Sequence, residues 1–138
     1  MLVVDASVLA PALADDAADG GAARARLRGQ SLAAPELIDL ETTSVSDLET
    51  TSVSRRLSQA RHIDLRRAAL ALTDLVELPL RQAPHRPLLP RCWELRQNLT
   101  VYDAAYVAEL LDALLLTADR RLASAPGLRC EIELLVSQ

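Results

Sequence analysis

The sequence predicts an α/β protein built around a mostly parallel sheet. Short apolar runs alternate along the chain with longer stretches that carry apolar residues at helical spacing, a pattern typical of strand–helix–strand units. Two of these runs, Leu2–Val4 and Leu114–Thr117, are soon followed by an aspartate, Asp5 and Asp119. Parallel strands end at the same edge of a sheet, so these two aspartates are expected to meet if their strands flank the point where the strand order reverses.

Length and composition bound the kind of protein. The chain has 138 residues, half of them apolar, which is enough for one core and predicts a single globular domain over residues 1–138. No segment approaches the roughly 20 apolar residues that span a bilayer. Asp5 falls where a signal peptide would be apolar, so we expect a cytoplasmic protein with no membrane partner. Cys92 and Cys130 are isolated in the sequence and are expected to be buried free thiols.

The charged residues exclude several functional classes. The net charge of −4 argues against nucleic-acid binding over the whole surface, although it leaves room for a local site. All 15 basic residues are arginine. Without lysine the chain lacks the phosphate-binding lysine of a P-loop and the amine of a Schiff-base enzyme, so both classes are excluded.

The first half of the chain is predicted to contain two strands and three helices. Ser7 is expected to cap a helix that runs to about Leu13, and the Asp- and Gly-rich residues 15–21 form an exposed break. A second helix follows over 22–30. A second strand is expected over 31–34, and Pro35 suits the first turn of a third helix.

An eight-residue segment occurs twice in tandem. Residues 39–46 are repeated without change as residues 47–54, so the duplication spans 39–54. If both copies were helical, the insertion would lengthen the helix by about 12 Å and rotate the following residues by about 80°. The Thr- and Ser-rich copies are mediocre helix formers, so the alternative is that one copy is looped out.

The second half is predicted to alternate again between helices and strands. Helical patterning from Arg55 is expected to break near residues 62–63 and to resume over 64–75. Pro79 confines the alternating segment 76–80 to an edge strand or a strand end. After a break, helices are expected around Cys92 and from Thr100, which is placed to act as an N-cap. The remaining elements are a strand over 113–117, a helix over 120–123 and a strand over 130–135.

Four acidic residues on four separate segments are candidates for one site. Asp5 and Asp119 follow strands, Glu41 lies in the helix after the second strand, and Asp103 lies in the first turn of a later helix, where it also favours the helix dipole. Crowded carboxylates repel one another unless a cation neutralises them, and Mg²⁺ and Mn²⁺ meet that need. Such a site suits the hydrolysis of phosphodiester bonds.

Four short motifs resemble those of a known family. These are Val4-Asp5-Ala6-Ser7, Ala34-Pro35-Glu36-Leu37 leading to Glu41, Leu99 to Tyr106 with Asp103, and Leu115-Leu116-Thr117-Ala118-Asp119. Together they look like the acidic motifs of PIN-domain nucleases and, within that group, of VapC toxins. The resemblance implies a three-layer α/β/α fold and an Mg²⁺- or Mn²⁺-dependent endoribonuclease that forms a homodimer and is inhibited by a VapB-type antitoxin.

The same resemblance assigns roles to individual residues. Asp5, Glu41, Asp103 and Asp119 match the catalytic, metal-binding acids, and Ser7 and Thr117 match small hydroxyl residues that support the site. The duplication supplies Glu49 as an alternative second acid. We favour Glu41, because the preceding strand fixes its position relative to Asp5.

Two further hypotheses remain open at this point. If the duplication displaces Glu41, the chain would be a catalytically impaired PIN-fold binding module that dimerises and binds antitoxin. A weaker option is a PIN nuclease that acts in RNA processing or on DNA flaps. In a nuclease, RNA would be steered by arginines, for which the candidates are Arg55, Arg56, Arg86, Arg91 and Arg120.

Overall fold

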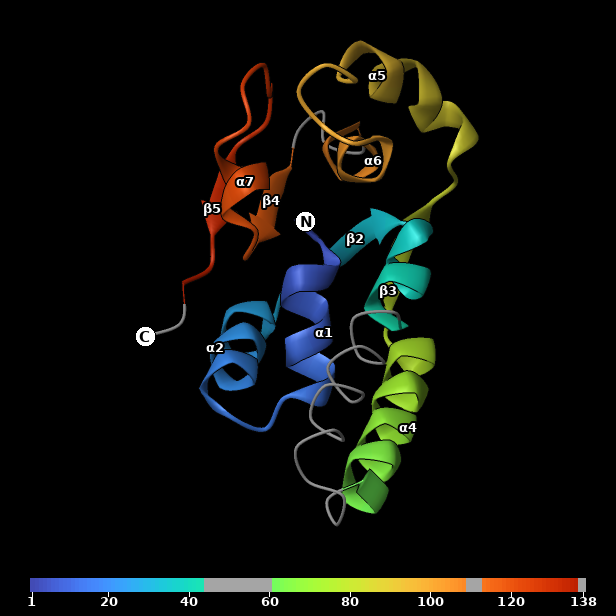
Figure 1. Ribbon diagram of the computed structural model, residues 1–138, viewed down its shortest axis with the longest axis vertical. Coiled ribbons are helices and arrows are strands. Elements are labelled where there is room, and N and C mark those ends of the chain that lie inside the picture. Colours follow the sequence, from blue (N-terminus) through green and yellow to red (C-terminus); the bar gives the residue numbers. More distant parts are fainter. Residues whose placement is uncertain (44–60, 109–112, 137–138) are drawn as a thin grey trace.

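The computed structural model of the protein describes residues 1–43, 61–108 and 113–136 (Figure 1). It contains one five-stranded sheet with the order β3-β2-β1-β4-β5. Its strands are β1 (Leu2–Val4), β2 (Leu32–Pro35), β3 (Leu80–Ala83), β4 (Leu114–Thr117) and β5 (Ile132–Leu134). All four strand pairings are parallel, which confirms the predicted sheet. The strand order reverses between β1 and β4, where a crevice forms beyond the carboxyl ends of parallel strands.

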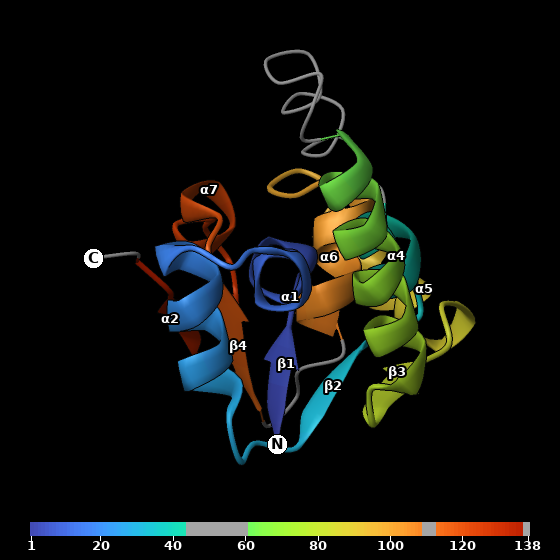
Figure 2. The ribbon, with the colours of Figure 1, turned by 90° about the horizontal axis from the view of Figure 1, so that it is seen from below.

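Helices cover both faces of the sheet and complete a three-layer α/β/α fold. One face carries α1 (Ala6–Ala14), α2 (Ala18–Leu27) and α4 (Arg61–Glu77), and the opposite face carries α5 (Leu89–Glu94) and α6 (Val101–Ala108) (Figures 1 and 2). The short helix α7 (Arg120–Ala123) connects β4 to β5, and a 3₁₀ turn, η1 (Arg86–Leu88), precedes α5. Residues 37–43 are also helical and follow β2.

The central strand explains why the amino-terminal apolar run is uninterrupted. Leu2, Val3 and Val4 are all at most 2% exposed. Leu2 and Val4 belong to one buried cluster with residues of α1 and α2, whereas Val3 belongs to a second cluster that includes residues of α5 and α6. Because successive side chains of a strand point to opposite faces, a strand covered on both sides needs apolar residues at every position.

The structure corrects two predictions in the middle of the chain. Helix α4 is continuous from Arg61 to Glu77, so the predicted break near residues 62–63 is wrong. The predicted strand over 76–80 is also wrong, because the helix continues into it and β3 begins only at Leu80. Ala71 and Leu75 are buried at helical spacing, and the partly buried Leu78 extends that row beyond the helix end. As predicted, Pro79 lies next to an edge strand.

Helix α2 starts earlier than the sequence predicted. The side chain of Asp15 accepts hydrogen bonds from the backbone N–H groups of Ala17 (2.8 Å) and Gly20 (3.1 Å), so the Asp-rich segment organises the start of the helix. Gly20 is buried in a close approach between α1 and α2, where an added Cβ would lie 1.8 Å from the Asp15 carbonyl oxygen. Pro35 ends β2 instead of starting the next helix.

The remaining predictions concern the two cysteines, membrane-spanning helices and the duplicated segment. Both cysteines are free thiols, Cys92 buried and Cys130 partly buried. Among the described residues, no helix combines the length and the apolar character needed to cross a membrane. The second copy of the duplicated octad, with Glu49, and the arginines Arg55 and Arg56 lie outside the described residues.

Candidate active site

The four acids predicted from the sequence line one cavity beyond the carboxyl ends of β1 and β4. This acidic crevice has a volume of about 360 Å³. Its lining residues are Asp5, Ala6, Ser7, Pro11, Glu41, Asp103, Tyr106 and Asp119. The structure therefore brings together side chains from four separate segments, as the strand order requires.

Asp5 is positioned by the transition from β1 to α1. It is the N-cap of α1, and its Oδ1 atom accepts a hydrogen bond from the Ser7 backbone N–H (3.1 Å). The prediction that Ser7 caps this helix is wrong, because Asp5 already supplies the accepting oxygen. The carboxylate that starts the helix is the same one that faces the crevice, so its orientation follows from the local fold.

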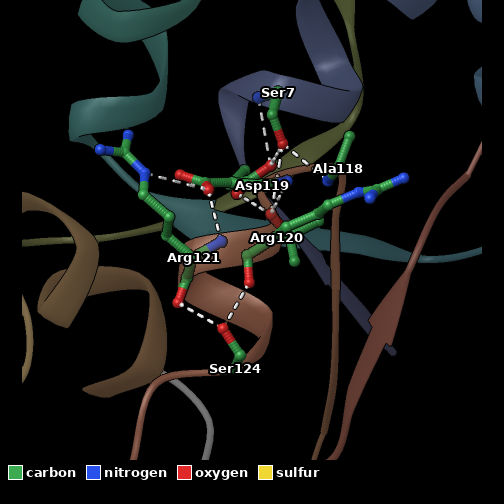
Figure 3. Close-up of polar contacts among 8 residues, drawn as sticks. Ser7, Ala118, Asp119, Arg120, Arg121 and Ser124 are labelled. Carbon is green, nitrogen blue, oxygen red and sulfur yellow. Dashed lines mark hydrogen bonds and ion pairs between the residues drawn. The ribbon is translucent and has the colours of Figure 1, made fainter.

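Two hydroxyl groups hold the Asp5 carboxylate in place. Ser7 Oγ donates to Asp5 Oδ1 (2.5 Å), and Thr117 Oγ1 donates to Asp5 Oδ2. The Ser7 hydroxyl also accepts a hydrogen bond from the Ala118 backbone N–H (2.8 Å), and the Thr117 hydroxyl accepts one from Asp119 N–H (3.0 Å) (Figure 3). The two hydroxyl oxygens also lie 3.2 Å from each other, so Asp5, Ser7 and Thr117 form one connected hydrogen-bond network.

The other two aspartates are placed by helix starts. Asp119 is the N-cap of α7, where its Oδ1 atom accepts from the Arg121 backbone N–H (2.9 Å) and lies 3.7 Å from Arg121 Nε (Figure 3). Asp103 lies in the first turn of α6, and its backbone N–H donates to Thr100 Oγ1 (3.2 Å). The predicted capping role of Thr100 is therefore confirmed.

Burial, together with repulsion between the carboxylates, raises the pKa values of three acids in the crevice. The pKa of Glu41 rises from its usual 4.5 to about 7, first because of burial and then because of the negative charges of Asp103 and Asp5. Burial also raises the pKa of Asp5, against the opposing effect of its hydrogen bonds from Ser7 and Thr117. The pKa of Asp103 is raised by burial, and the charge of Asp119 adds to the shift. The crevice thus concentrates negative charge that a cation would relieve.

Tyr106 lines the crevice and was not predicted as a site residue. Burial, followed by the charges of Glu41 and Asp5, raises the pKa of its phenol, so the hydroxyl stays protonated. Neither Tyr106 Oη nor Glu41 Oε1 has a hydrogen-bond partner of good geometry within the described part of the chain, yet the phenol lies close enough to the Glu41 carboxyl to oppose the rise in its pKa. The signal in the sequence was the spacing of three between Asp103 and Tyr106, which places both on one face of a helix.

The donor set is chemically suited to a hard divalent cation. It consists of carboxylate oxygens, and one of them, Glu41 Oε1, is buried without a partner among the described residues. No three acidic, histidine or cysteine side chains in the described ranges converge on one point as they are placed. The arrangement therefore fits an ion that is held by one or two carboxylates and keeps several water ligands, as Mg²⁺ does.

Comparison with known proteins identifies several ribonucleases that are similar to this chain. The chain is 40% identical over 136 residues to Ribonuclease VapC1 of Mycobacterium tuberculosis, and the match covers 96% of each protein. It is 37% identical over 134 residues to Ribonuclease VapC9 of the same organism, again with 96% of each covered. Ribonuclease VapC12 is 34% identical over 137 residues, which cover 98% of this chain and 99% of that protein. No protein-family model matches the sequence.

Identity at this level over nearly the full length of several relatives establishes the family. The chain belongs to the VapC family of PIN-domain toxins. The resemblance to that family, which the sequence suggested, is thereby confirmed.

Proposed function

We propose that this chain is a metal-dependent endoribonuclease toxin that acts in the cytoplasm and hydrolyses RNA phosphodiester bonds in the acidic crevice. The observation that supports this function most directly is the gathering of Asp5, Glu41, Asp103 and Asp119, from four segments, around one cavity. The VapC ribonucleases that match the chain along nearly their whole length support RNA as the substrate.

In this proposal Asp5, Glu41, Asp103 and Asp119 hold Mg²⁺ or Mn²⁺, one or two of them directly and the others through its water ligands, and the scissile phosphate is oriented by the cation. When bound, such an ion polarises the phosphate and promotes attack by water. Asp5 is the best-oriented acid, because hydroxyl donors fix both of its oxygens. In the metal-free protein the Glu41 carboxyl exchanges its proton near neutral pH, so cation binding there releases a proton. Ser7 and Thr117 support the site by positioning Asp5.

Cleavage of RNA by the purified protein tests this function. We expect cleavage with Mg²⁺ or Mn²⁺, its loss on adding a chelator, and a decrease of at least about 100-fold for Asp5→Asn. Asp74→Asn is the matched control, because Asp74 is exposed on α4 and does not line the crevice. Cleavage that survives both the chelator and Asp5→Asn would contradict the metal mechanism.

The same proposal includes two protein partners. We infer that the chain forms a homodimer and is inhibited by a VapB-type antitoxin, as the family resemblance implies. Light scattering of the purified chain tests the first inference. Addition of a VapB-type antitoxin to the cleavage assay tests the second, and a monomer or an uninhibited reaction would count against the respective inference.

One observation favours the alternative of a catalytically impaired binding module. No three carboxylates in the described ranges meet at one point, so direct binding of one ion by three or more of the acids would require side-chain movement. A chain that binds antitoxin tightly but cleaves no RNA at any Mg²⁺ or Mn²⁺ concentration would support this alternative over the nuclease.

A further inference from the structure

A second cavity adjoins the acidic crevice and has no role in the chemistry described above. This side cavity has a volume of about 250 Å³ and shares Ser7 and Pro11 with the crevice. Its other lining residues come from α2, the β4–α7 turn and the end of β5. They are Asp19, Ala22, Ala23, Ala118, Arg120, Leu134, Leu135 and Val136. The two cavities are therefore neighbours that share part of one wall.

The walls of the side cavity suit a flat ring. Alanine side chains at positions 22, 23 and 118 leave space, while Pro11, Leu135 and Val136 provide apolar surface. Small-molecule sites commonly combine such apolar walls with a few polar groups that fix orientation. A nucleobase has this shape, with two apolar faces and a polar edge.

The polar groups of the side cavity are one cation and one anion. Arg120 and Arg121 are consecutive, yet their side chains extend in opposite directions from the start of α7 (Figure 3). Arg121 pairs with Asp119 in the crevice, whereas Arg120 lines the side cavity and forms no ion pair within the described ranges. The exposed carboxylate of Asp19 lines the same cavity.

Arg120 and Asp19 have the chemistry to bind the phosphate and the base of a nucleotide. Arginine binds phosphate oxygens through charge-assisted hydrogen bonds, and an aspartate accepts hydrogen bonds from base N–H groups. We propose that the side cavity binds the base of a nucleotide next to the scissile phosphate, with Arg120 on a phosphate and Asp19 on the base edge. This inference rests on the proposed ribonuclease function. Guanine fits best, because its edge presents adjacent N–H donors to one carboxylate.

Binding of mononucleotides to the full chain, followed by amide NMR with a chelator present, tests the proposal without catalysis. The probes are 5′-GMP, 5′-UMP and ribose 5-phosphate, which lacks a base. We expect GMP to shift the amides of Ala22, Ala118 and Leu135 and to bind about 10-fold more tightly than ribose 5-phosphate. Equal affinity for GMP and ribose 5-phosphate, or shifts confined to the acidic crevice, would overturn the proposal.

Three substitutions locate the base and the phosphate within the side cavity. Ala22→Leu fills the cavity and should weaken GMP binding at least 5-fold, whereas Ala25→Leu, on the exposed face of the same helix, should not change it. Asp19→Asn should remove the preference for GMP over UMP. Arg120→Ala should weaken the binding of GMP and the binding of ribose 5-phosphate by the same factor. Unchanged GMP binding in folded Ala22→Leu, verified by its amide spectrum, would contradict the proposed location.

The RNA cleavage assay separates this inference from the proposed function. RNA cleavage by a chain that shows none of the GMP shifts would overturn the side-cavity inference and leave the nuclease intact. If GMP shifts these amide signals in a chain that cleaves no RNA, the proposed nuclease function would be overturned. The side cavity would then bind a base but would lack the RNA substrate proposed for it.

Discussion

The side chain of Asp5 has both a structural role and a place in the acidic crevice. Its carboxylate caps α1 and also lines the acidic crevice, and the Thr117 hydroxyl connects it to the neighbouring strand. Thr117 is fully buried and both donates to Asp5 and accepts from the Asp119 backbone N–H. This hydroxyl therefore couples two of the four acids through the end of β4.

Replacing Thr117 by valine tests that coupling. The substitution keeps the shape of the side chain but leaves the Oδ2 atom of Asp5 without its hydroxyl donor and the Asp119 N–H without an acceptor. We expect a loss of about 1–3 kcal/mol in the free energy of unfolding, measured by urea denaturation, because buried polar groups lose their partners. Thr117→Ser keeps the hydroxyl and should retain most of the stability. Equal losses for serine and valine would show that packing, not hydrogen bonding, accounts for the effect.

Glu41 makes the stability of the metal-free protein depend on pH. Its pKa is about 7 in the folded protein against a usual value of 4.5, so the folded state holds the proton more tightly. Stability should therefore fall as pH rises from about 4.5 to about 7. Glu41→Gln removes this dependence, and we expect the variant to be more stable than the parent by about 1 kcal/mol at pH 8, after allowance for the solvent screening of a half-buried group.

Thermal unfolding in a chelator at pH 4.5 and pH 8 measures this difference. The gain of Glu41→Gln should be present at pH 8 and nearly absent at pH 4.5. The same gain at both pH values would show that the ionisation of Glu41 is not its cause.

That the four acids lie near one another could be predicted from the sequence, whereas their surroundings could not. Asp5 and Asp119 follow strands and Asp103 lies in the first turn of a helix, which are positions that a sequence pattern reveals, and Glu41 lies in the helix after β2. The geometry around them depends on side-chain packing between segments that are distant in the sequence. The spacing of Tyr106 from Asp103 was a local signal, but the hydroxyl of Thr117 reaches Asp5 from the neighbouring strand, and no local pattern shows that contact.

At the scale of elements, the close pairing of α1 and α2 depends on one glycine. Gly20 is buried against the backbone of Asp15, and Arg24 of α2 donates to the carbonyl oxygens of Ala12 (3.1 Å) and Asp15 (2.6 Å). These contacts hold the turn between two helices whose residues also line the side cavity. The shape of that cavity therefore depends on how closely the helices approach.

The adjacent pair Gly20 and Gly21 provides a matched test of this approach. Gly20→Ala places a methyl group where there is no space, and we expect a loss of about 3 kcal/mol in the free energy of unfolding. Gly21→Ala meets no atom within 4 Å and should be neutral or should stabilise α2 by about 1 kcal/mol. Urea denaturation of the two variants measures both effects. Similar stability in the two variants would contradict the close approach.

Element boundaries were the least predictable part of the fold. The alternation of apolar and polar residues over 76–80 is short enough to suit either a strand or the end of a helix. The burial of Ala71 and Leu75, four residues apart, favours the helix. Residues 15–21 look like an exposed break because they are rich in Asp and Gly. Instead, the Asp15 side chain binds the N–H groups of the first turn of α2. Both outcomes depend on contacts that are made only in the folded protein.

At the scale of the whole molecule, the sheet order places repelling carboxylates together. The parallel pairing of the strands could be predicted, because alternating strands and helices favour right-handed parallel crossovers. What the alternation does not specify is the register, which pairs Val4 with Leu116 and so sets Asp5 opposite Thr117. Folding therefore brings the acids together against their mutual repulsion.

A divalent cation should relieve that repulsion and stabilise the fold. With Mg²⁺ or Mn²⁺ at 100 times its Kd, mass action contributes about 2.7 kcal/mol. For a chain of this size the corresponding rise in Tm is roughly 10 °C. We expect this rise in a thermal scan, its reversal by a chelator, and a much smaller rise for Asp119→Asn than for Asp74→Asn. Equal rises in the two variants would place cation binding outside the crevice.

The position of β4 beside β1 also determines when the crevice can form during translation. The ribosome makes Asp5 at the start, but β1 acquires its neighbour β4 only after Thr117 has left the exit tunnel. Until then the nascent chain carries Asp5 and Glu41 without the strand that aligns Asp5 and introduces Asp119. Completion of the acidic crevice is thus postponed to a late stage of synthesis, so a chain that ends before Thr117 lacks the strand that completes it.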